Sequence, residues 1–157
     1  MLLLLALLLT ALSIISTDVD IGRDNSFKAY MDYRTITDGS SVQYQLQETA
    51  RTDLYGFRRS DDERYMVALG TYYAGQEAGR RLTVVFDNGE SINCVVGDIK
   101  ADCHTDESNR FCEVGDELGC ILEFIVDVDK LPEDVRISGD CSKVFPGEIV
   151  SIVKENF

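Results

Sequence analysis

The sequence is short of basic residues. Its 157 residues include 15 Lys and Arg against 28 Asp and Glu, which leaves a formal net charge of −13 at pH 7. The basic pair Arg58-Arg59 is followed at once by the acidic stretch 61–63. Because such a chain repels phosphate backbones and anionic lipid, its composition argues against a nucleic-acid-binding protein.

Common metal and nucleophile motifs are also missing. The absence of C-x-x-C and H-E-x-x-H argues against a structural zinc site and a zinc protease. His104 is the single histidine, so no Ser-His-Asp pattern is persuasive, although Cys103 or Cys112 as a nucleophile stays open. We expect no cofactor.

The N-terminus is the apolar run MLLLLALLLTALSIIS. Its length of roughly 15 residues fits the hydrophobic region of a secretory signal better than a membrane-spanning helix of about 20. No Lys or Arg precedes the run, and no clean A-x-A cleavage site follows it. We expect residues 1–17 to be a signal peptide or short membrane anchor, with a buried core helix as the alternative. The protein is then secreted or attached to the outer side of the cell envelope.

Five cysteines lie in the C-terminal half, at positions 94, 103, 112, 120 and 141. In an exported protein they indicate disulfides, with at least one cysteine left over. Cys112 and Cys120 flank EVGDELG, which has the composition of a hairpin turn. We therefore favour a bridge between these two.

Residues 18–64 form a polar extension with one short helix. Ser40 and Gln43 have the spacing of a capping box, and SVQYQLQETAR follows without Gly or Pro, so we predict a helix at about 41–51.

From residue 65 the pattern is β. RYMVALGTYY, RLTVVF, SINCVVGDI, CILEFIVDV, DVRISG and GEIVSIVKE read as short strands. DNGE places a tight turn between the second and third, so residues 81–99 should form a hairpin. Six or more short strands with little helix predict a small β-barrel or sandwich at 65–157.

The stretch GDIKADCHTD is the densest cluster of titratable side chains. If it continues as a strand, the period of two puts Ile99, Ala101, Cys103 and Thr105 on one face. The opposite face then carries Asp98, Lys100, Asp102, His104 and Asp106. Asp127 and Asp129 end another apolar strand, as at a barrel mouth or an ordinary strand terminus.

Three interpretations of the acidic face stay open. One is a solvated edge strand. The second is a carboxylate-rich cleft, in which crowding raises one pKa and makes that group a proton donor near neutral pH. The third is a metal site, although DIKADCHTD lacks the central glycine and final glutamate of an EF-hand.

From residue 65 onward the order of pieces resembles the double-psi β-barrel domains of the RlpA-like group. It is closest to the "3D" (three-aspartate) domain of bacterial cell-wall proteins. The resemblance rests on RYMVALGTYY, DNGESINCVVGDIKAD, EFIVDVDKL and FPGEIVSIVKE. The whole chain, with MDYRTIT and SSVQYQLQETA, is also similar to secreted or phage-encoded proteins of Gram-positive bacteria. The resemblance to the RlpA-like group implies a six-stranded double-psi barrel, preceded by a short helix and the N-terminal segment.

The resemblance also implies a function, the cleavage of peptidoglycan by a lytic transglycosylase with an aspartate general acid/base. By position Asp98 matches the family's first aspartate and Asp127 a later one. The family's glycines after the first aspartate are absent from DIKADCHTD, so Asp102 or Asp106 as the acid stays open, with Lys100 and His104 as supporting groups.

We expect a monomer that acts on peptidoglycan or a related glycan and meets a membrane only through its N-terminal segment. The alternative is a non-catalytic wall-binding or carbohydrate-binding barrel that presents Tyr55, Tyr72 and Tyr73 to a sugar or peptide. A metal-dependent hydrolase is a third hypothesis.

Overall fold

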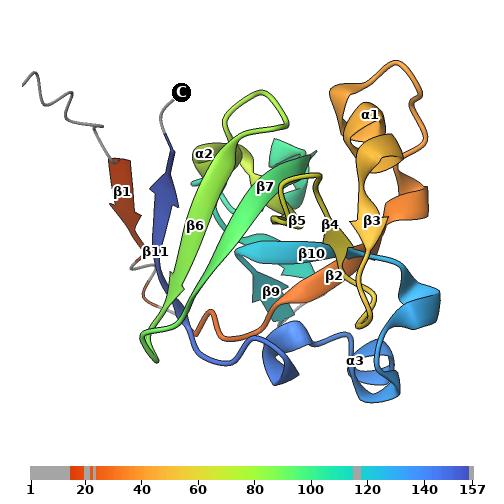
Figure 1. Ribbon diagram of the computed structural model, residues 1–157. Helices are drawn as coiled ribbons and strands as arrows, with labels where there is room; N and C mark the ends of the chain where they lie inside the picture. The colour runs from red at the N-terminus through yellow and green to blue at the C-terminus, as the bar shows by residue number, and fades with distance from the viewer. Residues whose placement is uncertain (1–14, 20–21, 23, 115–117, 156–157) are drawn as a thin grey trace, which may run out of the picture.

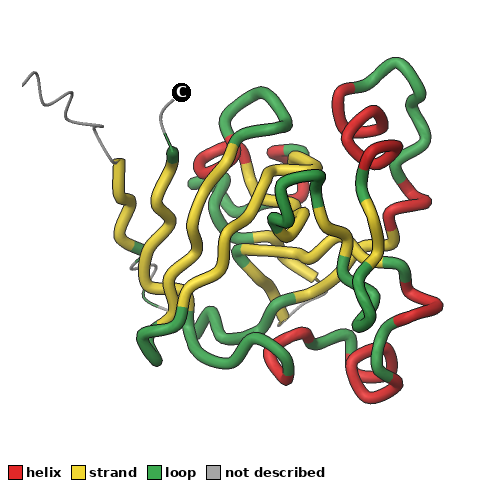
Figure 2. The backbone as a smooth tube through the Cα atoms, in the orientation of Figure 1, coloured by secondary structure: helices red, strands yellow, loops and turns green. Residues whose placement is uncertain are grey.

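The computed structural model describes residues 15–19, 22, 24–114 and 118–155 (Figure 1). It is mainly β, as the sequence predicts. Strands fill the middle of the molecule, and short helices lie around them (Figure 2).

The elements have the following bounds. The strands are β1 (Ile15–Asp18), β2 (Ala29–Asp32), β3 (Arg51–Thr52), β4 (Arg58–Arg59), β5 (Tyr65–Gly70), β6 (Arg81–Phe86), β7 (Ser91–Lys100), β8 (Cys112–Val114), β9 (Leu118–Cys120), β10 (Leu122–Val126) and β11 (Ile149–Lys154). The α-helices are α1 (Val42–Thr49), α2 (Thr71–Ala74) and α3 (Glu133–Ser138). The 3-10 helices are η1 (Tyr33–Thr35), η2 (Asp102–His104), η3 (Val128–Lys130) and η4 (Cys141–Lys143).

Nine strands form one mixed sheet. Its order is β1-β11-β6-β7-β5-β10-β2, with β3 and β4 attached beside β5, while β8 and β9 form a separate hairpin. β5 is parallel to β7, and β2 is parallel to β10. In the described part of the chain this sheet is not closed into a barrel. The expected barrel is therefore confirmed only as a mainly-β fold.

The sheet draws strands from both sides of the expected boundary at residue 65. β2 pairs with β10, and β4 pairs with β5. The division into segments 1–17, 18–64 and 65–157 stays a prediction. Residues 1–14 of the expected leader lie outside the described residues, and β1 pairs with β11 (Figure 1). No helix among the described residues is long and apolar enough to span a membrane.

The predicted helix and hairpin are both confirmed. In α1 the cap is Ser41, one residue after the predicted Ser40, and its Oγ accepts the Tyr44 N–H at 3.1 Å. β6 and β7 pair from Val85–Ser91 to Arg81–Val95, as the Asn-Gly turn predicts.

Three predicted strands are wrong at least in part. DVRISG lies in helix α3, because Pro132 and two acidic residues begin it and Gly139, at φ 71°, ends it. The extension of β7 to residue 106 is wrong past Lys100, where the chain turns into η2. Likewise, the strand at RYMVALGTYY stops at Gly70, and TYYA forms α2 with Tyr73 buried.

The main core lies on one face of the sheet. Every second residue of β10, from Leu122 to Val126, belongs to it. At its centre four aromatic rings pack with neighbouring centroids 4.4–6.0 Å apart: Phe57, Tyr65, Phe124 and Phe145. A smaller apolar cluster, built on Met66, Val95 and Ile125, lies on the other face beneath α1.

A bulge in β7 decides which face each later side chain occupies. In the pairing with β5, Val67 is opposite Val96 but Ala68 is opposite Asp98, so Gly97 is skipped. One extra residue reverses the alternation of the strand. Ile99 therefore continues to pack on the main core, whereas Asp98 and Lys100 lie on the face with α1.

The loop that contains Asn109 packs closely on Gly70, at the end of β5. A Cβ at Gly70 would collide with the carbonyl oxygen of Asn109, whereas a Cβ at Gly39 would meet nothing within 4 Å. Gly70→Ala should therefore lower the free energy of unfolding by about 1–3 kcal/mol. Gly39→Ala, the matched control, should stay within about 0.5 kcal/mol. Urea denaturation measures both, and equal effects would contradict the packing described.

Candidate active-site cleft

The α1-side face of the sheet carries a row of two carboxylates separated by an alanine. Glu123 on β10 is opposite Ala68 on β5, which in turn is opposite Asp98 on β7. Neighbouring strands lie about 4.8 Å apart, so the Cα atoms of Asp98 and Glu123 are roughly 9–10 Å apart. Ala29, opposite Glu123 on β2, continues the row. Ala68 separates the two acids, and Ala29 is buried against Cys112 and Cys120.

Lys100 spans this space to reach Glu123. Its Nζ lies 2.6 Å from Glu123 Oε1, and the two side chains are only 10% and 14% exposed. The strand partner of Lys100 is Gly70, whose missing side chain allows the carbonyl oxygen of Asn109 to approach β5 closely. Burial acts to lower the pKa of Lys100, but the charge and hydrogen bond of Glu123 outweigh it, and the net shift is upward. The ammonium is thus held charged by its partner.

Asp98 is the carboxyl with an altered proton affinity. Its side chain is half-buried, and burial raises its pKa above the ordinary value of 3.8. The backbone N–H of Ile99, the charge of Lys100 and a hydrogen bond from Gln43 act in the opposite direction, while Glu123 adds to the rise. A carboxyl in such a place is a better proton donor than an exposed aspartate.

An open cleft of about 790 Å³ lies above these groups. β7 contributes Asp98 and Lys100, β10 contributes Glu123, and the segment after β7 contributes Cys103 and the exposed His104. That segment is held by hydrogen bonds at its turn, where the backbone N–H groups of residues 104 and 105 donate to Ala101 O and Asp102 O.

The structure brings together three of the six predicted site residues, Asp98, Lys100 and His104. Asp102 is exposed outside the lining of the cleft, and its Oδ1 accepts a hydrogen bond from Thr71 Oγ1 at 2.7 Å. Asp106 accepts backbone N–H groups of residues 110 and 111 at 2.9 and 3.0 Å, which shapes the following turn. Because the chain leaves the strand at Lys100, the expected single row of charge is interrupted.

Asp127 belongs to a different cluster. Its Oδ1 accepts Arg34 Nη2 at 3.1 Å, and Arg34 also pairs with Asp32 at 2.8 Å and Asp129 at 2.7 Å. These contacts join the end of β10 to the segment after β2. Asp127 does not line the cleft that holds Asp98.

The sequence interpretation missed Glu123. The available signal is a lone acid inside the apolar strand LEFIV, where Leu122 and Phe124 on either side are buried in the main core. A glutamate at the alternate position of such a strand lies on the opposite face. Lys100 is its partner, and only the tertiary fold shows this.

The two cysteines of the favoured bridge are cross-strand neighbours, but no disulfide joins them. Cys112 is opposite Cys120 in the β8–β9 hairpin. The described residues include all five cysteines, and no disulfide joins any of them. Burial raises the pKa of the Cys120 thiol to about 12. The favoured bridge therefore stays a prediction.

The described residues hold no group of three His, Cys, Asp or Glu side chains arranged for a metal ion. Of the tyrosines expected to face a ligand, Tyr73 is buried in the main core, while Tyr55 and Tyr72 are 63% and 41% exposed. The cleft thus offers carboxyls, an ammonium, an imidazole and the thiols of Cys103 and Cys112 as its reactive groups.

Removing one member of the Lys100–Glu123 pair should cost more than removing both. Glu123→Gln leaves a buried ammonium without its counter-ion, a loss of up to about 3–5 kcal/mol, whereas Lys100→Met combined with Glu123→Gln should recover much of it. The folded pKa of Lys100 is raised above 10.5, so the pair's contribution is complete below pH 10.5 and is lost as the pH rises through the folded pKa. Urea denaturation of the single and double variants at pH 7 measures the coupling, and additive losses would contradict it.

Comparisons with known proteins leave the function to be argued from this cleft. No family model, no curated protein and no solved structure matches the chain. The resemblance to the RlpA-like and 3D domains therefore remains an expectation. What the chain does has to follow from the chemistry of Asp98, Lys100, His104 and Glu123.

Proposed function

We propose that this protein is an exported enzyme that cleaves peptidoglycan glycan strands in the manner of a lytic transglycosylase, with Asp98 as general acid and base. The observation that carries the proposal is the position of Asp98, a half-buried carboxyl of raised pKa at the wall of an open cleft. A general acid must hold its proton near the working pH, and burial shifts the pKa of Asp98 in that direction.

The proposed reaction uses one proton twice. Asp98 donates its proton to the glycosidic oxygen as the bond from that oxygen to the sugar C1 breaks. The 6-hydroxyl of the same sugar then bonds to C1 and gives its proton to the Asp98 carboxylate. The products are a strand with a new hydroxyl end and a 1,6-anhydro sugar, and no water is consumed.

Glu123 and Lys100 take supporting parts in this proposal. Positive charge develops at C1 during bond breaking, and a carboxylate on the same face of the sheet stabilises it. Lys100, at 2.6 Å from Glu123, fixes the position of that carboxylate. His104 is an exposed residue of the cleft lining, and we assign it to contact with the sugar or its peptide. The surplus of acidic residues is compatible with a substrate that is recognised through its neutral sugar rings.

The other expectations from the sequence belong to the same proposal. The apolar N-terminal run supports export to the cell envelope, and we propose a monomer without cofactor. The double-psi barrel also remains proposed. Its support is the mixed sheet with two parallel pairings, β5 with β7 and β2 with β10.

A non-catalytic wall-binding module is the alternative. It is favoured by a single observation, the extent of the hollowed surface beyond Asp98, where two further clefts lie. Such a module would sediment with purified cell wall and release no sugar.

Asp98→Asn should reduce the release of anhydro-sugars from purified peptidoglycan by about 10²–10⁴-fold, because the amide cannot donate the proton. Mass spectrometry of the soluble fragments measures this, since the anhydro product is lighter than the hydrolysis product by one water molecule. Asp61→Asn, an exposed carboxyl on the loop between β4 and β5, is the matched control and should keep full activity.

Asp102→Asn and Asp127→Asn distinguish the assignment of the acid from the reaction itself. If either variant loses activity while Asp98→Asn keeps it, Asp98 is not the acid. Full activity in all three variants, or no cleavage by the unaltered protein, would contradict the proposal.

A further inference from the structure

We infer that the cleft at Asp98 is one end of a groove that binds an extended glycan strand, with a distal sugar subsite between Tyr44 on α1 and the segment that follows β2. This inference rests on the proposed function and names the form of its substrate, a polymer in place of a short fragment. Nothing in the sequence pattern pointed to these residues.

Shared lining residues make the three clefts neighbours in series. Met31 and Asp98 line both the cleft at the candidate acid and a second cleft of about 330 Å³. Ile36 and Thr37 line both that second cleft and a third of about 460 Å³. Each volume lies within the roughly 300–1,000 Å³ of an ordinary small-molecule site. Three such volumes in series fit a chain of sugar units better than one small molecule.

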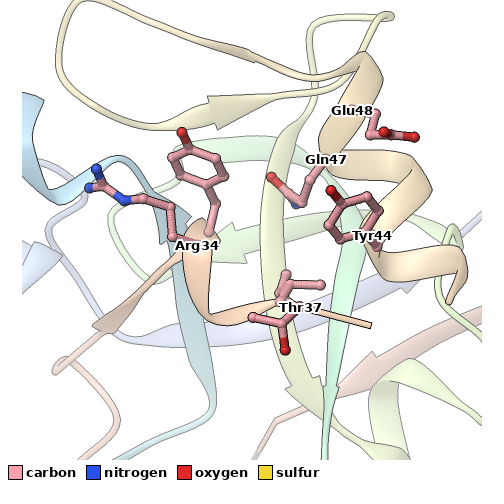
Figure 3. A pocket seen from close by; sticks show the side chains of 7 residues that line it. Arg34, Thr37, Tyr44, Gln47 and Glu48 are labelled. Carbon is pink, nitrogen blue, oxygen red and sulfur yellow. The ribbon is translucent and has the colours of Figure 1, made fainter. Parts of the chain in front are cut away.

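The third cleft has the lining of a sugar site. It combines the rings of Tyr33 and Tyr44 with the hydroxyl of Thr37, and the buried amide of Gln47, which already bonds Met66 and Arg58, forms part of its wall. Tyr44 and Gln47 project from α1 toward the segment with Thr37, while the Glu48 carboxylate points away from the space between them (Figure 3). An aromatic ring packs against the C–H face of a sugar, and neutral amides and hydroxyls bond its hydroxyl groups.

The charges around the third cleft disfavour an anionic ligand. Arg34 is its single basic side chain, and its guanidinium points away from Tyr44 (Figure 3). That guanidinium donates hydrogen bonds to the carboxylates of Asp32, Asp127 and Asp129 at 2.7–3.1 Å. Binding a phosphate or carboxylate would compete with three acids already in place, so a neutral ligand is favoured.

The Tyr33 side of the third cleft is held in place by contacts within the protein. The Arg58 guanidinium lies 4.3 Å from the centroid of the Tyr33 ring. Arg58 is buried and donates to Gln47 Oε1 at 3.0 Å, to Gln47 O at 2.7 Å and to Thr52 Oγ1 at 2.9 Å. The same contacts fix the Gln47 amide. A pre-organised wall loses little conformational entropy on binding, which is what a specific subsite requires.

The inference is tested by the dependence of cleavage on substrate length. The substrates are long glycan strands from purified peptidoglycan, freed of peptide, and a tetrasaccharide of the same sugars. Tyr44→Ala should raise KM on long strands about tenfold, the effect of losing roughly 1.4 kcal/mol of binding, with a much smaller change on the tetrasaccharide. Tyr44→Phe keeps the ring and should retain most of the affinity for long strands. Gln45→Ala, exposed on the same helix outside the cleft lining, is the matched control and should change neither.

The outcomes separate the groove from the catalytic proposal. If Asp98→Asn abolishes cleavage and Tyr44→Ala affects both substrates equally or neither, the groove is wrong and the proposed function stands. If the unaltered protein cleaves nothing, the proposed function fails, and sedimentation with the long strands then tests the groove. Weaker sedimentation of Tyr44→Ala than of Gln45→Ala would support it, and equal sedimentation would overturn it.

Discussion

The arrangement of the candidate site depends on one skipped residue, Gly97, in the parallel pairing of β5 and β7. The residue lies between Met66 and Ile125, where a Cβ would come within 2.6 Å of Ile125 Cδ1. Without this bulge the simple alternation of β7 would direct Asp98 and Lys100 into the aromatic core and Ile99 toward α1. With it, the strand keeps its apolar side chains inside and delivers two charged ones to the opposite face.

That opposite face combines small and charged residues in a way that makes a cleft. Ala68 has a small side chain on β5, the carbonyl oxygen of Asn109 occupies the position above Gly70, and Lys100 crosses β5 to reach Glu123. The ion pair joins two half-buried charges of the cleft, while burial raises the pKa of Asp98 despite the nearby charge of Lys100. Two neighbouring carboxyls whose surroundings shift their pKa values differently can take different roles in a reaction. On this basis we assign proton transfer to Asp98 and charge stabilisation to Glu123.

Local patterns predicted the local structure well. The helix α1 and the Asn-Gly turn between β6 and β7 depend on a few residues each, and both appear as expected, with the helix capped by Ser41 in place of Ser40. The strand expected at DVRISG failed because Pro132, the acidic first turn and Gly139 outweigh its β-branched residues. The acidic row failed past Lys100, and Glu123 was missed, because a bulge and a cross-strand ion pair depend on tertiary contacts that no window of sequence contains.

The central claim is that Asp98 is a carboxyl poised to donate a proton, and its titration tests this most directly. Carbon-detected NMR of labelled protein follows the side-chain carboxyl of each aspartate with pH, and Asp98→Asn identifies the Asp98 signal. We expect Asp98 to titrate above 3.8, whereas Asp38, whose pKa is lowered by hydrogen bonds from Ser40, should titrate below it in the same spectra. A midpoint for Asp98 at or below 3.8 would contradict the account.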